Sequence, residues 1–225
     1  MKKAAAETPE AGRPRGPLRI AVIGANGKSG SLIAREAAAR GHNVTAIVRR
    51  DVKTPAERTL VRDVFDLTAA DLAGFDAVVD AFGAWKPEDL PLHKRHLEHL
   101  ASILAGSATR LLVVGSAGSL YADGSHTTRV LESPQMPEQF KPLAAAMSEG
   151  LDYLRTRGDV AWTYVSPPLD FRADGEQTGS YNLAGEEFTL NPQGKSAMSY
   201  ADYAIALVDE IEAGKHVRER ISLLS

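Results

Sequence analysis

Short apolar runs alternate with longer amphipathic segments along most of this chain. The first run, residues 18–23 (LRIAVI), is mostly apolar and ends at a glycine, which is typical of a strand buried on both faces of a parallel sheet. Similar runs predict further strands at residues 43–48, 59–65, 76–82, 110–115 and 160–165. Apolar residues with helical spacing predict helices at residues 29–40, 90–105 and 143–155. This alternation predicts an α/β fold with a doubly wound parallel sheet.

The pattern changes after residue 166. The segment that follows is rich in turn formers and predicts loops, of which residues 171–182 could form either a lid over a substrate or an ordinary surface loop. Residues 187–190 predict a small hairpin, residues 200–212 an amphipathic helix and residues 221–224 a last strand. We therefore expect a single domain over residues 18–225, with substrate loops at about 166–200 and a small C-terminal elaboration.

Residues 1–17 differ from the rest of the chain. They combine Ala, Pro, Gly and charged residues with almost no aromatic or β-branched side chains, which predicts a disordered N-terminal tail. Lys2 and Lys3 are not followed by an apolar stretch, so no secretory signal is expected and we predict a cytoplasmic protein.

Composition narrows the classes of function. With 26 basic and 29 acidic residues the formal charge is −3, so no strong positive field is expected that would hold nucleic acid or an anionic membrane. The absence of cysteine excludes disulfides, thiolate nucleophiles and cysteine-ligated metal sites. No apolar run approaches the roughly 18–20 residues that span a bilayer. We expect a small-molecule partner and a monomer or homodimer.

A glycine-rich segment joins the first predicted strand to the first predicted helix. Residues 24–30 read GANGKSG, a G-x-x-G-x-x-G pattern. Glycine permits a tight turn after the strand, close approach of the main chain to a diphosphate and close packing of the helix on the sheet. The two residues between Gly24 and Gly27 are too few for a phosphate-binding loop of the NTPase type. The segment therefore predicts dinucleotide binding.

The residues after the second predicted strand indicate which dinucleotide is bound. An acidic residue at this place holds the ribose 2′-hydroxyl of NAD, whereas this strand is followed by Arg49 and Arg50. Guanidinium groups form forked hydrogen bonds to a 2′-phosphate, which favours NADPH. If the strand ends later, Asp51 could instead be the acidic partner of the ribose. Arg49 and Arg50 could also simply lie in a solvated turn.

Other candidate ligand contacts follow the third, fourth and fifth predicted strands. Asp66 lies where an adenine is expected, although it could equally cap a following helix. Small residues at 81–84 and 115–118 would let the main chain pass close to a ligand beyond the carboxyl ends of the strands. Ser116 could donate a hydrogen bond to the acceptor or cap the next turn.

Five segments of the chain resemble the flavin-reductase-like group of the atypical short-chain dehydrogenases/reductases. They are GANGKSG (24–30), DAVVDAFGAW (76–85), RLLVVGSAGSLY (110–121), AWTYVSPPLDFRADGEQTGSYNL (161–183) and SYADYAIALVDEIE (199–212). NmrA-like and biliverdin-reductase-B-like proteins belong to the wider circle. The resemblance implies a Rossmann fold, NAD(P) binding and reduction of a flavin-like acceptor. It implies phosphate contacts from Gly24, Asn26, Gly27, Lys28, Ser29 and Gly30, an adenosine-phosphate contact from Arg49, ribose contacts from Ala81, Phe82 and Gly83, and nicotinamide contacts from Ser116 and Pro167.

The chain departs from the larger superfamily at its proton-transfer pair. Typical members use Tyr-x-x-x-Lys, but Tyr153 is followed by Arg157 and Tyr164 by Pro168 at that spacing. Carbonyl reduction needs an acid or an oxyanion donor, whereas a flavin can take its proton from water. The missing pair therefore favours a flavin, quinone or similar planar acceptor, with Ser116 as the candidate catalytic residue. The alternatives are a non-catalytic NmrA-like NADP(H) sensor and, less favoured, an epimerase or carbonyl reductase.

Three histidines follow one another on the helix predicted at residues 90–105. His93, His96 and His99 are spaced three apart, so the outer two diverge by about 120° around a helix. We therefore expect a solvated face rather than a metal site, with a contact between His93 and substrate as a lesser alternative.

Overall fold

A single twisted sheet forms the centre of the molecule. The computed structural model describes residues 16–225, and the predicted residues 1–15 of the tail lie outside them. The sheet has the order β3-β2-β1-β4-β5-β6-β10-β8, in which β8 alone runs antiparallel to its neighbour within the described residues. Its strands are β1 (Arg19–Ile23), β2 (Asn43–Val48), β3 (Arg58–Val61), β4 (Ala77–Asp80), β5 (Arg110–Val114), β6 (Ala161–Ser166), β8 (Asn182–Ala184) and β10 (Glu219–Leu224). The predicted α/β fold, a Rossmann-like doubly wound parallel sheet, is confirmed.

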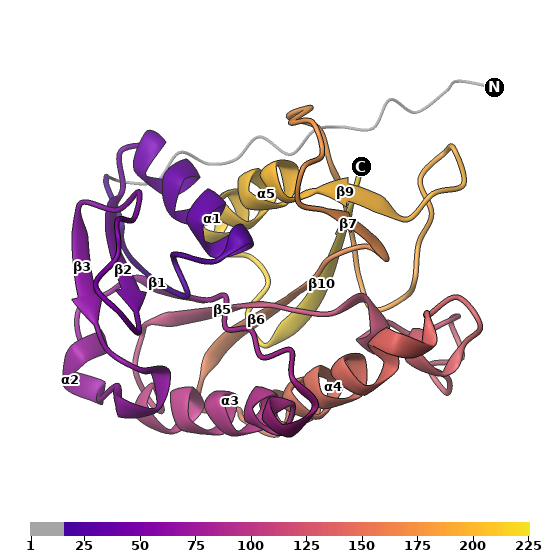
Figure 1. Ribbon diagram of the computed structural model, residues 1–225, viewed down its shortest axis with the longest axis horizontal. Coiled ribbons are helices and arrows are strands. Elements are labelled where there is room, and N and C mark those ends of the chain that lie inside the picture. The colour runs from indigo at the N-terminus through magenta and orange to yellow at the C-terminus, as the bar shows by residue number, and fades with distance from the viewer. Residues whose placement is uncertain (1–15) are drawn as a thin grey trace.

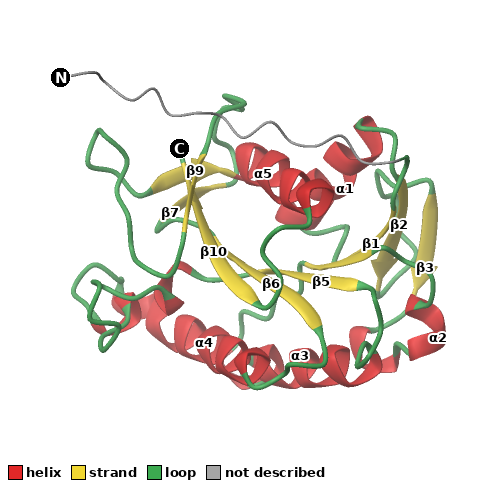
Figure 2. Cartoon of the chain, turned by 180° about the vertical axis from the view of Figure 1, so that it is seen from behind, coloured by secondary structure: helices red, strands yellow, loops and turns green. Residues whose placement is uncertain are grey.

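Helices cover both faces of this sheet (Figures 1 and 2). On one face lie α1 (Lys28–Ala39) and α5 (Tyr200–Ala213), and on the other α3 (Leu92–Ile103) and α4 (Lys141–Arg155), while the short α2 (Ala69–Leu72) lies near β3. Ile20 and Val22 of β1 belong to the apolar cluster that includes α1 and α5. Ala21 and Ile23 belong to the cluster that includes α3 and α4. The unbroken apolar run thus reflects burial on both faces.

One strand and one helix have clearly different bounds from those predicted. The strand predicted at 59–65 ends at Val61, because Asp63 accepts a hydrogen bond from the Phe65 amide and caps a 3-10 turn over Val64–Asp66. The helix predicted from residue 90 begins at Leu92, after Pro91.

The C-terminal elaboration contains a small second sheet. β7 (Asp170–Arg172) and β9 (Ala197–Ser199) pair in parallel beside α5. The hairpin predicted at residues 187–190 does not form. Phe188 instead packs against a small apolar cluster, and its amide donates to the carbonyl of Tyr121. No helix among residues 16–225 is long and apolar enough to cross a membrane.

Candidate functional site

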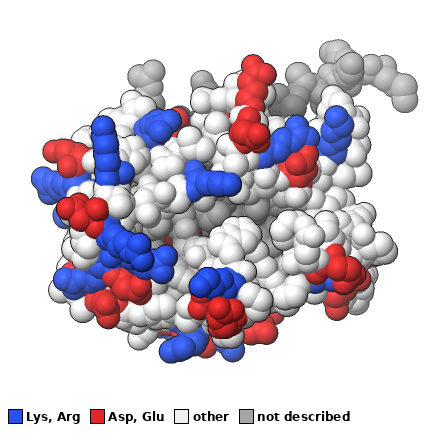
Figure 3. Space-filling model, viewed as in Figure 1, with Lys and Arg blue, Asp and Glu red and all other residues white. Residues whose placement is uncertain are grey.

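A cavity of about 1120 Å³ opens at the carboxyl ends of the parallel strands. Figure 3 shows the hollow near the middle of this face. Its lining includes residues at or just after the ends of five strands, namely Ile23, Val48, Ala81, Val114 and Pro167. This edge of an open parallel sheet, at the point where the strand order reverses, is where such folds bind ligands. The volume slightly exceeds the roughly 300–1,000 Å³ of typical small-molecule sites.

The glycine loop between β1 and α1 forms one end of the cavity. Gly24 has a φ of +72°, and a Cβ there would lie 2.6 Å from the carbonyl oxygen of Ala81. A Cβ on Gly30 would lie 2.3 Å from the carbonyl oxygen of Gly24. The first glycine therefore permits the turn and the close approach to β4, and the last one lets α1 pack against the loop.

The N-terminus of α1 faces this end of the cavity without a cap of its own. Gly27 is the N-cap residue, no side chain caps the helix, and its first turn carries no acidic residue. Free amide groups and the positive end of the helix dipole attract a phosphate. The exposed Lys28 and the half-buried Ser29 line the cavity beside them. These groups fit a dinucleotide diphosphate, with Asn26 also in the lining.

Two arginines line the cavity directly after β2, which ends at Val48 as predicted. Arg49 and Arg50 are exposed, and neither forms an ion pair within residues 16–225. Asp51, the acidic alternative, is not part of the lining. Arg62, which the sequence did not single out, lines the cavity too and donates to Asp71 at 2.9 Å.

Not every predicted contact residue reaches the cavity. Asp66 is exposed and is not part of the lining, whereas the neighbouring Val64 is. The capping alternative for Asp66 is also wrong, because Asp63 caps the 3-10 turn and Thr68 caps α2. Gly30 is absent from the lining as well, and its place behind Gly24 gives it a packing role.

The turn after β4 passes under the middle of the cavity. Ala81, Phe82 and Gly83 line it, and the ribose contacts that the resemblance implies for them stay a prediction. Asp80, at the end of β4, accepts a hydrogen bond from the Phe82 amide with one carboxylate oxygen and lies 2.7 Å from His96 Nε2 with the other. His93 Nε2 lies 2.9 Å from the Ala84 carbonyl oxygen.

The expected solvated histidine face is therefore wrong. His93 and His96 are buried, and His99 Nε2 lies 2.9 Å from the carbonyl oxygen of Leu67. Each ring finds an acceptor on an element that packs against α3, so the helix can bury a polar face. Within residues 16–225 no group of three or more His, Cys, Asp or Glu residues could hold a metal ion.

The pKa values of the two buried histidines are shifted in opposite directions. Burial lowers the pKa of His93, and the hydrogen bond to Ala84 offsets this only in part. Burial would lower the pKa of His96 as well, but the Asp80 carboxylate and the hydrogen bond to it outweigh burial and raise it.

Ser116 and Pro167 line the cavity just after β5 and β6. Ser116 Oγ accepts a hydrogen bond from the Gly118 amide at 3.1 Å, so the capping alternative is confirmed. A hydroxyl that accepts this bond still has its own proton to donate. The cap therefore leaves Ser116 able to donate to a ligand.

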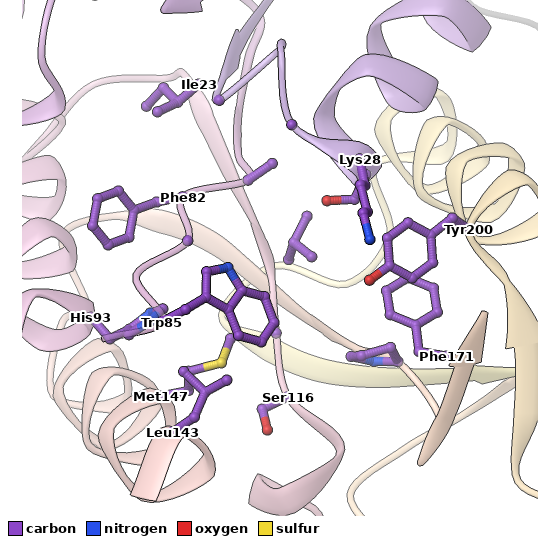
Figure 4. A pocket seen from close by; sticks show the side chains of 18 of the residues that line it. Ile23, Lys28, Phe82, Trp85, His93, Ser116, Leu143, Met147, Phe171 and Tyr200 are labelled. Carbon is purple, nitrogen blue, oxygen red and sulfur yellow. The ribbon is translucent and has the colours of Figure 1, made fainter. Parts of the chain in front are cut away.

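Beyond Ser116 the cavity is walled by apolar and aromatic side chains (Figure 4). Leu143, Ala144 and Met147 of α4 form one wall, and Trp85 lies near them with 72% of its surface exposed. Phe171 and Tyr200 form the opposite wall, with ring centroids 3.8 Å apart. We call this region the acceptor end. Phe171 lies in the segment predicted as a possible substrate lid, whereas the α4 residues and Trp85 were not predicted to line a site, because they come from segments far apart in the chain.

No tyrosine of the cavity belongs to a Tyr-x-x-x-Lys motif. Tyr164 is fully buried, which raises its pKa, and Tyr200 has a pKa raised by burial with Ala204 four residues on. The α4 residues that line this wall are apolar.

The predicted substrate loops take part only at their beginning. Pro167, Pro168, Leu169, Asp170 and Phe171 line the cavity, as does Tyr200, but residues 172–199 do not. The Asp202 carboxylate of α5 accepts hydrogen bonds from Thr178 and Gly179, which anchors this loop to the helix.

Comparison with known proteins gives a consistent result. A family model described as NAD(P)H-binding matches residues 24–213. The "Uncharacterized protein YwnB" of Bacillus subtilis (strain 168) is 44% identical over 211 residues, which cover 92% of this chain and 99% of that protein. A solved structure from Streptococcus pneumoniae, described as "a putative NADH-flavin reductase", has 57% identity and a TM-score of 0.91, covering 92% of this chain and 99% of the other.

A third relative bears on where the protein is found. A Burkholderia pseudomallei structure described as a "Putative exported protein" has 34% identity and a TM-score of 0.81, covering 92% of this chain and all (100%) of the other. The cytoplasmic location stays a prediction.

Proposed function

The chain belongs to the NAD(P)H-binding family, and from that premise we propose that it transfers hydride from NADPH to a flavin, quinone or similar planar acceptor. The Streptococcus pneumoniae relative, by its description, supports a flavin.

The arginines after β2 support NADPH over NADH. Arg49 and Arg50 line the cavity, and neither has an ion-pair partner in the described chain. Asp51 lies outside the lining, so it offers no carboxylate to the ribose 2′-hydroxyl of NADH. An unpaired guanidinium at this place would bind a 2′-phosphate through charge-assisted hydrogen bonds.

The single observation that carries the proposed reaction is the composition of the acceptor end. It offers apolar surfaces on both sides, from Trp85 and Met147 on one and from Phe171 on the other, and no Tyr-x-x-x-Lys motif. A planar ring system would be held there by stacking and burial. Carbonyl reduction would lack its usual proton donor, whereas a flavin or quinone needs mainly to be held in the right orientation.

The residues then divide the work. The nicotinamide, when bound, supplies the hydride. The glycine loop and the α1 N-terminus hold the diphosphate, and Arg49 and Arg50 select the phosphate on the ribose. Ser116 donates a hydrogen bond to the acceptor, and the apolar walls exclude water from the reacting atoms.

The experiment mixes the purified protein with NADPH and each of riboflavin, FMN and a soluble quinone, and follows the loss of nicotinamide absorbance. We expect turnover with at least one of these acceptors and faster turnover with NADPH than with NADH. Tight NADPH binding without turnover on any planar acceptor would contradict the proposal and would support the NADP(H) sensor instead.

A further inference from the structure

A buried ion pair lies directly behind the turn that lines the middle of the cavity. Asp80 and His96 expose only 2% and 3% of their side chains, and their charged atoms are 2.7 Å apart. Buried charges are expensive, so a pair in this position calls for a role. Neither residue lines the cavity itself.

The hydrogen bonds of His96 define its protonation. Its Nε2 faces the Asp80 carboxylate, and its Nδ1 lies 2.9 Å from the Leu92 carbonyl oxygen. The Leu92 carbonyl can only accept, so Nδ1 carries a proton, and an ionised Asp80 requires a second proton on Nε2. A charged His96 beside an ionised Asp80 satisfies both contacts.

The pair contacts the turn in two places, and His93 contacts it in a third. Asp80 accepts from the Phe82 amide at 3.1 Å, and the Phe82 ring stacks on the His96 ring with centroids 4.3 Å apart. His93, one turn earlier on α3, bonds to Ala84 at the other end of the turn. These hydrogen bonds and the stacked rings hold the turn at both of its ends.

The same turn also contacts the glycine loop. The space that a Cβ on Gly24 would need is taken by the carbonyl of Ala81. A displacement of the turn would therefore disturb both the ribose contacts and the loop that holds the diphosphate.

We propose that the Asp80–His96 pair positions the cofactor site: it holds the 81–84 turn in the geometry that NAD(P)H binds, without touching the cofactor. This rests on the proposed place of the cofactor. The titratable groups around the pair are His93 on α3 and Tyr164 on β6.

The test compares Asp80→Ala with Asp80→Asn. Alanine removes both acceptors, and we expect the Kd for NADPH to rise about tenfold while kcat at saturating NADPH changes less than about twofold. Asparagine can accept from the Phe82 amide and donate to a neutral His96, so we expect it to restore most of the affinity.

Glu210→Ala is the matched control. Glu210 is also a buried carboxylate paired with a histidine, His216, and an arginine, Arg110, but unlike the partners of Asp80 these residues do not contact the turn that lines the cavity. It should destabilise the fold without changing the Kd for NADPH. An equal change in Kd from Asp80→Ala and Glu210→Ala, or no change from either, would overturn the proposal.

Two measurements on the cofactor-free protein separate this proposal from the proposed function. The ¹⁵N shifts of His96 in the unaltered protein should show an imidazolium at pH 7, and this needs no variant to fold. Amide exchange at Phe82 and Ala84 should speed up in Asp80→Ala and not in Glu210→Ala. A neutral His96 would overturn the proposal of a charged Asp80–His96 pair, even if the protein binds NADPH. A charged pair in a protein that binds no NADPH would instead overturn the proposed function.

Discussion

The two ends of the cavity are built from different parts of the protein. At the end next to α1, the groups that would meet a ligand belong mainly to the main chain, in a loop whose conformation depends on Gly24 and Gly30. At the acceptor end they are side chains, contributed by the turn after β4, by α4, by the start of β7 and by α5. Main-chain geometry tolerates little change, whereas a wall of side chains can be exchanged piece by piece. Substitutions should therefore have sharper effects at the first end than at the second.

The largest effect is expected at Gly24. Gly24→Ala must place a Cβ 2.6 Å from a main-chain oxygen and keep a φ of +72°, so we expect NADPH affinity to fall by about 100-fold or more. Gly41→Ala is the control, because Gly41 follows the other end of α1 with a φ of +85° and nothing near its Cβ position. It should cost about 1 kcal/mol of unfolding free energy and leave the Kd unchanged. Equal Kd changes at the two positions would remove the distinction.

Arg49→Ala should have the next largest effect. Losing hydrogen bonds to a charged group costs about 1.5–3 kcal/mol, so the Kd for NADPH should rise roughly 10- to 100-fold while that for NADH stays the same. Arg58→Ala provides the control, since Arg58 is exposed on β3 and does not line this cavity. Tighter binding of NADH than of NADPH by the unaltered protein would contradict the assignment.

At the acceptor end, Trp85→Ala should have a smaller and different effect. Loss of an aromatic contact of about 0.5–1.5 kcal/mol should raise the KM for the acceptor up to about tenfold and leave the Kd for NADPH unchanged. Leu183→Ala removes a similarly exposed apolar side chain on β8, outside the lining, and should change neither value. A change in NADPH affinity with no change in the KM for the acceptor would contradict the place of Trp85 at the acceptor end.

The smallest effect is expected at Ser116. Ser116→Ala removes one hydrogen bond to the acceptor, so we expect kcat to fall about threefold with the Kd for NADPH unchanged. Ser119 belongs to the same turn but is fully buried and outside the lining, which makes Ser119→Ala the control for damage to the turn. Equal losses of kcat in both variants would assign Ser116 a structural role only.

The same contrast explains what could be predicted from the sequence. The glycine loop, the arginines after β2 and the small residues after β4 are local: each follows a strand that its own apolar run reveals. Once the strands are in parallel order, their carboxyl ends meet and the site follows. The end of the cavity next to α1, which we call the phosphate end, could therefore be predicted from patterns of adjacent residues.

The acceptor end and the buried histidines depend on contacts that no local pattern records. Met147 and Phe171 approach one cavity only because α4 and β7, which lie on opposite faces of the sheet, both reach its carboxyl edge. His96 looked solvent-facing because the carboxylate that pairs with it lies on β4, 16 residues earlier in the chain. The hairpin wrongly predicted at 187–190 has a similar cause, since the Phe188 amide donates to the Tyr121 carbonyl rather than to a neighbouring strand.

The most direct test of the account is a crystal structure of the protein with NADPH bound. We predict the diphosphate against the main-chain amides of residues 24–30, the 2′-phosphate on Arg49 and the nicotinamide ring beside Pro167, with its open face toward the acceptor end. A cofactor bound in the reverse direction, or outside this cavity, would contradict the division of the site into a phosphate end and an acceptor end.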